Sequence, residues 1–518
     1  MKNKKKKKGL WFGMCFAAAM LILSSFIPSN AAKQTKSQIT SSKTPIDTGR
    51  SSATWLRSFS GKAISYNSSP VFRNGLLYIV NENILYELDK KGNILRRLTL
   101  QASMNSVCHL TLYGDFLYIP LDGGMIQCVQ CSSMRSVWKS ERFGGQSLSG
   151  ITYHENFLYA GNTLTPAGKT SGIFYCLDAT DGHTVWTYED KKTPGGYYWS
   201  GSAVKGNAIF FAGDNGTLVS HSLLTEEVYD RRILTDTAKI RAEILCDNVS
   251  GALYTTSNDG SIYRIMADET GKVKSVITKK IVSGAKSANC TSTPVIWNNR
   301  LYVGSLADGC GYISVLNASD LKPHYHVSTG KYREVKSTPL ISTGYASGGN
   351  KQTVYVYFTC NALPGGVYRI TDSENTVTSK LQTVFIPAQK QFCLASVCAD
   401  EDGTLYYSND SGYLFALSAK APIHRTPKKP TRLKWKKKKG KWILTFKKNE
   451  KTAQTLIYCR QKSGKWSKKG NTSSSRYILK RKGHKTLFIR LRNRIRGKNK
   501  KWSYSKYTKT YILKDSPL

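Results

Sequence analysis

The chain has 518 residues, 77 Lys or Arg against 33 Asp or Glu, and a formal net charge of +44. Its length exceeds what one ordinary hydrophobic core holds, so we expect two folded units after a leader. Its 12 cysteines are too few for a disulfide-dense scaffold. Aromatic residues make up 11% of the chain and helical spacing of apolar residues is absent, which indicates an all-β protein.

Residues 1–32 have the layout of a secretory signal. Lys2 and Lys4 to Lys8 form a basic head, an apolar run extends from Leu10 to Ile27, and small residues follow Pro28. We expect cleavage, although the run is also long enough to serve as an uncleaved membrane anchor. No second apolar span follows, so we expect an extracellular protein that is secreted or associated with the cell surface. Contact with the membrane is expected only if the leader is uncleaved.

Eleven cysteines follow the leader, and their spacing is scattered. Cys128 and Cys131 form a C-x-x-C pair, but residues three apart in a strand point to opposite faces, so we expect no shared metal there. Most of the cysteines are interpreted as small buried hydrophobes. One or two disulfides stay open, Cys393 with Cys398 for instance.

An apolar-aromatic-apolar core recurs eight times between residues 65 and 420, at steps of 40 to 53 residues. This is the period of a four-stranded propeller blade, so the repeat predicts an eight-bladed β-propeller over residues 50–420. Asp-Gly and Asn-Gly pairs between the expected strands suit tight hairpins. The eight cores are Leu77-Tyr78-Ile79, Leu117-Tyr118-Ile119, Leu158-Tyr159-Ala160, Phe210-Phe211-Ala212, Leu253-Tyr254-Thr255, Leu301-Tyr302-Val303, Val354-Tyr355-Val356 and Leu405-Tyr406-Tyr407.

The third copy carries the most specific motif, Leu-Asp-Ala-x-Asp-Gly-x-x-x-Trp at Leu177–Trp186, and Ser-Thr-Pro recurs at Ser292–Pro294 and Ser337–Pro339. These residues resemble the pyrroloquinoline-quinone-type (PQQ-type) propeller repeat, which is also found in the outer-membrane assembly lipoprotein BamB. The resemblance covers roughly residues 50–420 and implies the fold more than the function. The fourth to eighth copies lack the Trp, so the repeat has diverged.

The eighth copy lacks an outer strand, because Pro422 and further prolines follow soon after Leu417. Upstream of the first copy, the segment Thr54–Phe59 reads like the missing strand, with Trp55 at the expected place. We predict that this segment pairs into the last blade, which would close the ring and cover an exposed edge.

Residues 421–430 form a basic, Pro-rich linker, and residues 431–514 then return to short strands separated by glycines. The strand pattern predicts a small β-sandwich. Leu487–Arg492, followed by Gly497-Lys498 and Trp502–Tyr507, resembles a fibronectin type III module. That resemblance implies that Trp435 and Tyr458 are buried.

The PQQ-type repeat invites comparison with quinone dehydrogenases, whose resemblance implies adjacent cysteines, a cluster of acids around calcium and a catalytic Asp. No two cysteines are adjacent here, and most acids of the repeats occupy turn positions. His324 and His326 share one strand face without an evident third ligand, so we interpret them as facing solvent. We therefore predict no catalytic residue, no cofactor and no metal site. A secreted quinone- or metal-dependent oxidoreductase is the alternative.

The loops that lead from one blade to the next gather at one mouth of a propeller channel. In this chain they hold aromatic side chains beside Arg, Lys and Asn, which suits a sugar, a peptide or an acidic group. Ordinary polar capping of that face is the alternative. The candidate ligand-binding residues are Tyr198, Trp199, Arg241, Asn289, Arg333 and Lys336.

The excess charge belongs to the tail, where residues 421–518 hold 33 Lys or Arg and only two acids, Glu450 and Asp515. Charge alone would suit nucleic acid. Because we expect secretion, we favour an anionic cell-wall polymer or glycan over nucleic acid as the partner. A solvated lysine-rich face is the alternative. The candidate polyanion-binding residues are Lys436, Lys437, Lys438, Lys439, Arg490, Arg492 and Trp502. We expect a non-enzymatic binding or scaffold protein, with a protein or glycan partner on the propeller face.

Overall fold

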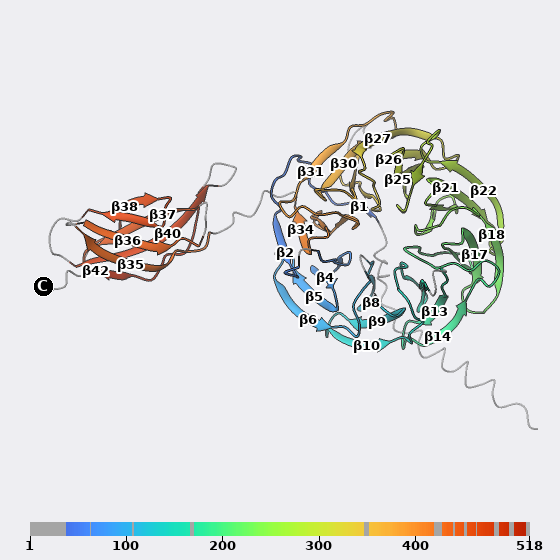
Figure 1. Cartoon of the computed structure of the whole chain (residues 1–518), viewed down its shortest axis with the longest axis horizontal. Helices are drawn as coiled ribbons and strands as arrows, with labels where there is room; N and C mark the ends of the chain where they lie inside the picture. Colours follow the sequence, from blue (N-terminus) through green and yellow to red (C-terminus); the bar gives the residue numbers. More distant parts are fainter. Residues whose placement is uncertain are drawn as a thin grey trace, which may run out of the picture. The chain divides into compact units, whose positions relative to one another are not determined.

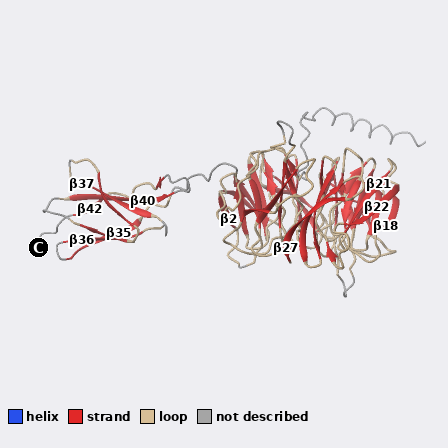
Figure 2. Cartoon of the chain, turned by 90° about the horizontal axis from the view of Figure 1, so that it is seen from above, coloured by secondary structure: helices blue, strands red, loops and turns tan. Residues whose placement is uncertain are grey.

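The structure is a computed structural model that describes residues 38–513, except for 63, 106–107, 166–169, 347–351, 419–426, 439–440, 450–452, 463, 481–485 and 497–501. The expected leader, most of the linker and Lys439 lie outside the described residues. The described part of the chain is all-β and contains no helix (Figure 2), and therefore none that could cross a membrane. The chain divides into two compact units, Met1–Ala419 and Lys420–Leu518.

The described residues of the first unit form eight sheets of four or five strands, numbered here in chain order as sheets 1 to 8. They are arranged radially, as in a β-propeller, with the outer strands β6, β10, β14, β18 and β22 on the rim (Figure 1). The strands of sheets 1 to 4 are β3 (Val71–Arg73), β4 (Leu76–Asn81), β5 (Ile84–Asp89) and β6 (Ile94–Thr99); β7 (Thr111–Tyr113), β8 (Phe116–Leu121), β9 (Met125–Gln130) and β10 (Arg135–Lys139); β11 (Thr152–His154), β12 (Phe157–Gly161), β13 (Phe174–Asp178) and β14 (Thr184–Tyr188); and β15 (Ala203–Lys205), β16 (Ala208–Ala212), β17 (Thr217–Ser222) and β18 (Val228–Ile233).

Sheets 5 to 8 continue in the same antiparallel order, and sheets 7 and 8 each include a strand from the start of the described chain. Their strands are β19 (Leu245–Cys246), β20 (Leu253–Thr256), β21 (Ser261–Ala267) and β22 (Val273–Lys280); β23 (Ala288–Asn289), β24 (Val295–Trp297), β25 (Arg300–Ala307), β26 (Cys310–Asn317) and β27 (Pro323–Lys331); β28 (Leu340–Ser342), β29 (Val354–Thr359), β30 (Val367–Asp372), β31 (Gln382–Phe385) and β1 (Ile39–Thr40); and β32 (Cys398–Ala399), β33 (Leu405–Ser408), β34 (Tyr413–Leu417) and β2 (Trp55–Ser58).

The repeated tyrosine of the sequence is a buried core residue in the second strand of a sheet. In sheet 6, Tyr302 is fully buried and its hydroxyl donates to Asp372 Oδ2 at 2.6 Å in sheet 7, where Arg300 Nε also donates at 2.8 Å. Two positions of the predicted repeat were wrong by one or two residues. The strand register equates Tyr302 with Phe210 in sheet 4 and Tyr357 in sheet 7, in place of Phe211 and Tyr355. Adjacent or alternating aromatic residues left this register ambiguous in the sequence.

The predicted outer strand of the last sheet is confirmed. β2 pairs antiparallel with β34, with Trp55 opposite Ala416. The Trp55 indole donates from Nε1 to the carbonyl oxygen of Lys90 in sheet 1 at 2.9 Å. A Cβ atom on Gly92 of the same turn would lie 2.6 Å from the Trp55 ring, so the glycine leaves room for the indole. Sheet 8 is thereby held against sheet 1.

Trp138, on the outer strand of sheet 2, makes the same contact with sheet 3. Its Nε1 donates to the carbonyl oxygen of Ala179 at 3.0 Å, and its ring covers Gly182. The Asp-Gly turn of the repeat therefore forms the tight hairpin and also leaves room for the Trp ring of the preceding sheet to pack on it. This pairing gives the Asp-Gly-x-x-x-Trp motif its physical meaning.

Residues 38–50 belong to the first unit, which the predicted start at residue 50 missed. β1 pairs in parallel with β28, and Arg50 forms a parallel bridge with Phe385 of β31. Between these points the Thr44 hydroxyl donates to the buried Tyr357 hydroxyl at 2.9 Å. A two-residue strand carries no periodicity, so the sequence offered no signal for it.

The second unit has two sheets that share one core. β35, β36 and β39 form the first sheet, whereas β37, β38, β40, β41 and β42 form the second. The buried Trp442 and Leu444 of the first sheet pack in one cluster with Ile489 and Leu491 of the second. The strands are β35 (Thr431–Lys438), β36 (Lys441–Lys447), β37 (Gln454–Arg460), β38 (Ser467–Thr472), β39 (Arg476–Leu479), β40 (Leu487–Arg496), β41 (Trp502–Tyr504) and β42 (Tyr511–Leu513).

The expectation that Trp435 is buried was wrong. Its side chain is 36% exposed, and Trp442 on the neighbouring strand supplies the core indole instead. Tyr458 is half-buried on the outward face of β37. Trp435 shares the face of the buried Leu433 and lies opposite the buried Leu444, but the stretch of β35 that follows Leu433 is exposed.

The eleven cysteines that the structure describes are free thiols, including Cys393 and Cys398. Burial raises the pKa of the Cys393 thiol to about 12. Cys128 and Cys131 lie in different core clusters, as the alternation of a strand predicts. Eight of these eleven thiols are buried and act as apolar groups, whereas Cys246, Cys310 and Cys398 are half-buried.

Candidate functional site

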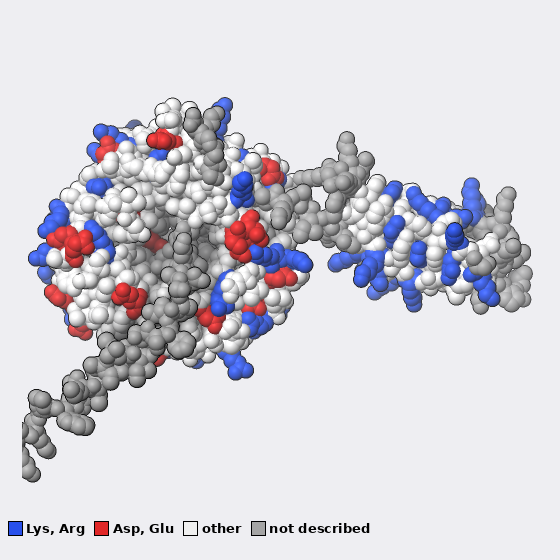
Figure 3. All heavy atoms as spheres, turned by 180° about the vertical axis from the view of Figure 1, so that it is seen from behind, with Lys and Arg blue, Asp and Glu red and all other residues white. Residues whose placement is uncertain are grey.

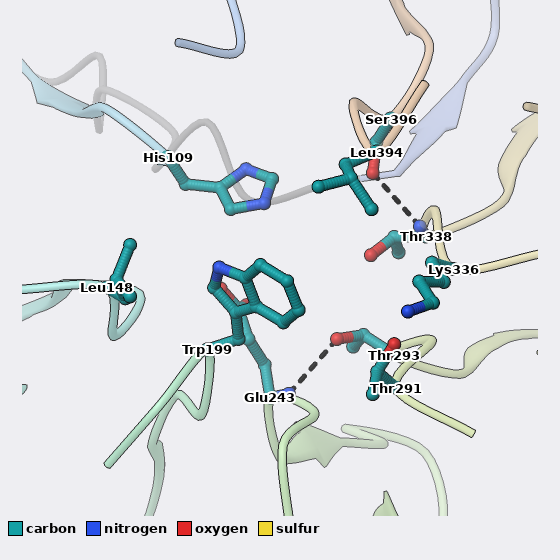
Figure 4. A pocket seen from close by; sticks show the side chains of 10 residues that line it. All are labelled: His109, Leu148, Trp199, Glu243, Thr291, Thr293, Lys336, Thr338, Leu394 and Ser396. Atoms are coloured by element: carbon teal, nitrogen blue, oxygen red, sulfur yellow. Dashed lines mark hydrogen bonds between the residues drawn. The ribbon is translucent and has the colours of Figure 1, made fainter. Parts of the chain in front are cut away.

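A pocket of about 520 Å³, including its open mouth, lies among the chain segments that precede the first strands of sheets 2 to 8. Each of its lining residues stands two or four positions before the first residue of β7, β11, β15, β19, β24, β28 or β32. The lining therefore comes from seven successive sheets (Figure 4). It comprises His109, Leu148, Trp199, Glu243, Thr291, Thr293, Lys336, Thr338, Leu394 and Ser396.

Trp199 projects into the middle of the pocket, with the His109 ring facing it (Figure 4). Its backbone has a φ of 56°, in the left-handed region that non-glycine residues seldom adopt. Such a conformation persists only where surrounding structure enforces it, and it is frequent at ligand sites. The indole thus gives the pocket an apolar face with a donor at its edge.

Hydroxyl groups line the side of the pocket formed by sheets 6 to 8. The Thr293 hydroxyl oxygen accepts from the Glu243 backbone N–H at 3.0 Å, and the Ser396 hydroxyl oxygen accepts from the Thr338 N–H at 2.9 Å (Figure 4). Each hydroxyl is thereby tied to the backbone of the preceding sheet. These bonds fix the side chains before a ligand arrives, which lowers the entropic cost of binding.

Glu243 supplies the one carboxylate among the described lining residues. Its side chain lies across Gly150 and Gly201, which form parallel bridges in the series Gly150, Gly201, Glu243. A Cβ atom at Gly150 would lie 2.1 Å from Glu243 Oε1, and one at Gly201 would lie 2.6 Å from Glu243 Cγ. Glycine at both positions therefore makes the space that the carboxylate occupies.

Two of the six predicted mouth residues, Trp199 and Lys336, line this pocket. Arg241 holds the equivalent position in its own loop but is turned to another partner. Its Nε and Nη2 donate to the Asp214 carboxylate at 2.8 and 2.7 Å, and its guanidinium lies 4.5 Å from the Tyr198 ring. Arg241 and Tyr198 thus form an internal contact outside the pocket lining.

Asn289 and Arg333 are likewise engaged with neighbouring residues. Asn289 Nδ2 donates to Glu334 Oε1 at 2.6 Å, and Lys336 Nζ lies 3.6 Å from Glu334 Oε2. Burial raises the pKa of Glu334, against the opposing effects of Lys336 and Asn289. The Arg333 guanidinium lies 4.6 Å from the Tyr368 ring. Asn289 therefore reaches the pocket only indirectly, through the Glu334–Lys336 pair.

Sequence reasoning missed the other eight lining residues: His109, Leu148, Glu243, Thr291, Thr293, Thr338, Leu394 and Ser396. It had found the correct loops but selected the most conspicuous side chains in them. The repeat contained the missing signal. The residue between the two lining positions of each loop is a buried Ser or Ala in sheets 3 to 8 and the buried Cys108 in sheet 2, and Ser-Thr-Pro marks the nearer lining position in sheets 6 and 7.

The quinone dehydrogenases that the repeat resembles would imply a quinone with a calcium ion. Such a cation takes about six to eight oxygen ligands, several of them carboxylates. The pocket lining offers one carboxylate, Glu243, together with the ammonium of Lys336, which would repel a cation. Across the described ranges, no three His, Cys, Asp or Glu side chains are gathered as a metal site. The donor set does not fit this cofactor.

The predicted polyanion residues of the tail fall on two different sheets. Lys436, Lys437 and Lys438 lie on β35, whereas Arg490 and Arg492 lie on β40 beside Trp502 on β41. On the face that Figure 3 shows, the second unit is densely covered with Lys and Arg, while the first unit carries both signs of charge. The structure thus divides one predicted site into two candidate surfaces.

The radial sheets and the contacts that Trp55 and Trp138 make between neighbouring sheets give the first unit a β-propeller fold. Comparison with solved structures agrees with this fold. BamB from Moraxella catarrhalis is 13% identical with a TM-score of 0.50, covering 70% of this chain and 100% of that one. Quinohemoprotein alcohol dehydrogenase from Comamonas testosteroni is 11% identical with a TM-score of 0.52, covering 74% and 79%.

Sqt1 from Saccharomyces cerevisiae is 12% identical with a TM-score of 0.52, covering 70% of this chain and 98% of that one. At these identities the likeness concerns the fold alone. No protein-family model and no curated protein sequence matches the chain.

Proposed function

We propose that this chain is a non-enzymatic binding or scaffold protein of the cell envelope. The propeller pocket binds a glycan or a segment of a protein partner, and the basic second unit holds an anionic wall polymer. The pocket carries this proposal: it combines an indole face with fixed hydroxyls and one charge of each sign, from Glu243 and Lys336. Aromatic faces beside hydrogen-bonding groups suit sugars and polar peptide segments.

The finer architecture belongs to the same proposal. The first unit is an eight-bladed ring, supported by eight radial sheets and by the contact between Trp55 of sheet 8 and Gly92 of sheet 1. The second unit is a fibronectin type III-like β-sandwich, supported by two sheets around one core. Secretion rests on the sequence of residues 1–32 and on the excess positive charge, which suits the anionic polymers of an envelope.

The test of the pocket is a binding screen of the full chain against wall-derived glycans and peptides, read by titration calorimetry. We expect Trp199→Ala to weaken binding of the selected ligand at least about tenfold, because the indole forms the central contact. Tyr332→Ala is the matched control, since Tyr332 is an exposed aromatic with a φ of 54° outside the lining. Equal losses in the two variants would contradict the assignment of the pocket.

The alternative, a quinone-dependent oxidoreductase, is separated from binding by a dye-reduction assay with added quinone and calcium. We expect no turnover of alcohols or sugars, because the pocket donor set does not suit the cation. Robust reduction that Trp199→Ala or Glu243→Gln abolishes would replace the binding proposal with the enzyme.

A further inference from the structure

One face of the second unit carries an ordered row of guanidinium groups. Arg490, Arg492 and Arg494 alternate along β40 with Leu491 and Asn493, which are buried. The three arginines therefore share the outward face of the sheet. Alternate residues on a strand are separated by about 6.8 Å, so the row repeats its charge at that interval.

Aromatic rings separate these guanidiniums and hold them in place. Arg490 lies 4.3 Å from the Trp466 ring and 3.8 Å from the Tyr507 ring. The remaining contacts continue the pattern along the sheet. They are Arg492 with Tyr507 at 4.7 Å and Tyr504 at 4.3 Å, Arg494 with Trp502 at 3.8 Å, and Arg460 with Trp466 at 5.2 Å. We call these four arginines, together with the aromatic residues that they contact, the arginine ladder.

Internal acids do not explain the ladder. The only acidic side chains of residues 421–518 are Glu450 and Asp515, both outside the described residues. The Nε atoms of Arg460, Arg490 and Arg492 are buried without a hydrogen-bond partner, whereas Arg492 Nη2 donates to the Tyr458 hydroxyl at 3.1 Å and Arg494 Nε donates to Gln454 Oε1 at 2.7 Å. A row of like charges held in fixed positions is electrostatically unfavourable until an anion neutralises it.

We propose that the arginine ladder is the binding track for a flexible polyol-phosphate polymer of the teichoic type. This rests on the proposed function of the second unit and names its ligand class. Guanidinium edges match phosphate oxygens in a two-pronged geometry that an ammonium cannot reproduce. Covalent bond lengths place successive phosphates of an extended glycerol-phosphate chain about 7 Å apart, close to the interval of the ladder.

Two competing polymers fit less well. Single-stranded nucleic acid binds such surfaces by stacking its bases on aromatic rings, but the rings of the ladder already have guanidiniums against them. Uronate polymers with one carboxylate per disaccharide set their charges two sugar rings apart, which exceeds the spacing of the row. The ladder therefore favours a closely charged chain that contributes no bases.

The lysines of β35 supply a matched control within the same unit. Lys434, Lys436 and Lys438 are exposed on the outward face of the other sheet and carry the same total charge as Arg490, Arg492 and Arg494. Lysine side chains are flexible point charges, so their loss should cost little beyond screened attraction. Loss of the arginines should weaken binding much more, because the aromatic rings hold the guanidiniums in position before the polymer binds.

The experiment measures binding of purified glycerol-phosphate teichoic acid to the full chain at about 150 mM salt, a concentration that already weakens loose phosphate contacts. Changing Arg490, Arg492 and Arg494 together to Gln should weaken binding at least about tenfold, and changing them to Lys should give an intermediate loss. The triple change of Lys434, Lys436 and Lys438 to Gln should weaken binding about twofold or less. Melting curves of every variant separate lost binding from lost folding, and the Lys variant keeps most of the aliphatic stems on the rings.

Equal losses in the two Gln variants, or full binding by the Lys variant, would contradict the proposed role of the arginine ladder. Either result would mean that the total positive charge of the unit causes the binding. Equal or tighter binding of hyaluronate or of an oligothymidylate with the same number of charges would overturn the choice of polymer. If the wild-type chain binds none of these polymers even at low salt, the polymer-binding role proposed for the second unit fails as well. Stronger binding of teichoic acid, together with selective loss in the ladder variant, supports the inference.

Discussion

At the scale of single residues, the environment of a side chain decides its role more than its type does. Arg241 and Lys336 occupy equivalent positions in their loops, four residues before the first strand of a sheet. Asp214 holds the guanidinium of Arg241 outside the pocket lining, whereas Lys336 stays in that lining. Two cationic residues at the same repeat position therefore differ in role, because their partners differ.

Asp410, in the turn between β33 and β34, provides a prediction of pH dependence. Burial raises its pKa to about 6, from an ordinary value near 3.8. A carboxyl whose folded pKa is raised binds its proton more tightly in the folded state, so it destabilises the fold once it ionises. The penalty is fully present above about pH 6 and is relieved as the pH falls toward 4.

Asp410→Asn should therefore raise the free energy of unfolding at pH 7.5 by about 1 kcal/mol, after allowance for the partial solvent exposure of the group. The gain should shrink toward zero near pH 4, where the wild-type carboxyl is protonated in both states. Urea denaturation at the two pH values measures the difference. A gain that is independent of pH would show that the ionisation of Asp410 is not its cause.

Much of the candidate site was within reach of the sequence, and its limits have a physical cause. The repeat located the loops, and two of the six candidate residues chosen there, Trp199 and Lys336, line the pocket. The repeat position of Glu243 was within reach, but the placement of its carboxylate was not, because that depends on the space left by Gly150 and Gly201, two sheets and one sheet earlier in the chain. Steric room of this kind between distant segments cannot be read from a local motif.

At the scale of elements, strand prediction succeeded where alternation and burial were strong. It failed for β1, which has two residues, and for β38, whose sequence Ser-Lys-Lys-Gly-Asn-Thr is polar throughout. Both strands exist because an edge of a neighbouring strand is available to pair with, β28 for β1 and β37 for β38. Pairing with an existing edge is a tertiary effect that local composition does not record.

The closing strand β2 provides the prediction at this scale. Trp55→Ala removes a half-buried indole that contacts Gly92 and donates to Lys90 in sheet 1. Since the indole is partly exposed, we expect a loss of about 2 kcal/mol in the free energy of unfolding, below the cost of a fully buried Trp. Leu56→Ala on the same strand is the control, because Leu56 is 44% exposed and faces outward.

Chemical denaturation gives the free energy of unfolding of the first unit in both variants. It is followed by circular dichroism of the backbone, a signal that does not rely on the tryptophan that is removed. The predicted order is a clear shift for Trp55→Ala and less than about 0.5 kcal/mol for Leu56→Ala. Indistinguishable curves for wild type and Trp55→Ala would mean that the contact between sheets 8 and 1 contributes little to closure.

At the scale of the whole molecule, charge separates the two units. Of the 77 Lys or Arg residues, 33 lie in residues 421–518 with only two acids, so the excess charge is concentrated in the second unit. The pocket of the first unit is instead built from hydroxyls, an indole and balanced single charges. One chain is therefore expected to show two kinds of binding, one that depends strongly on salt and one that does not.

The most direct measurement is the salt dependence of both activities in the full chain. Binding of purified cell wall should fall about a thousandfold or more between roughly 50 and 200 mM salt, as expected when six to ten phosphate contacts release counterions. Binding of the pocket ligand should change only a few-fold over the same range, because its contacts are short and partly apolar. Wall binding that ignores salt, or a pocket ligand that follows the same steep slope as the wall, would contradict the account.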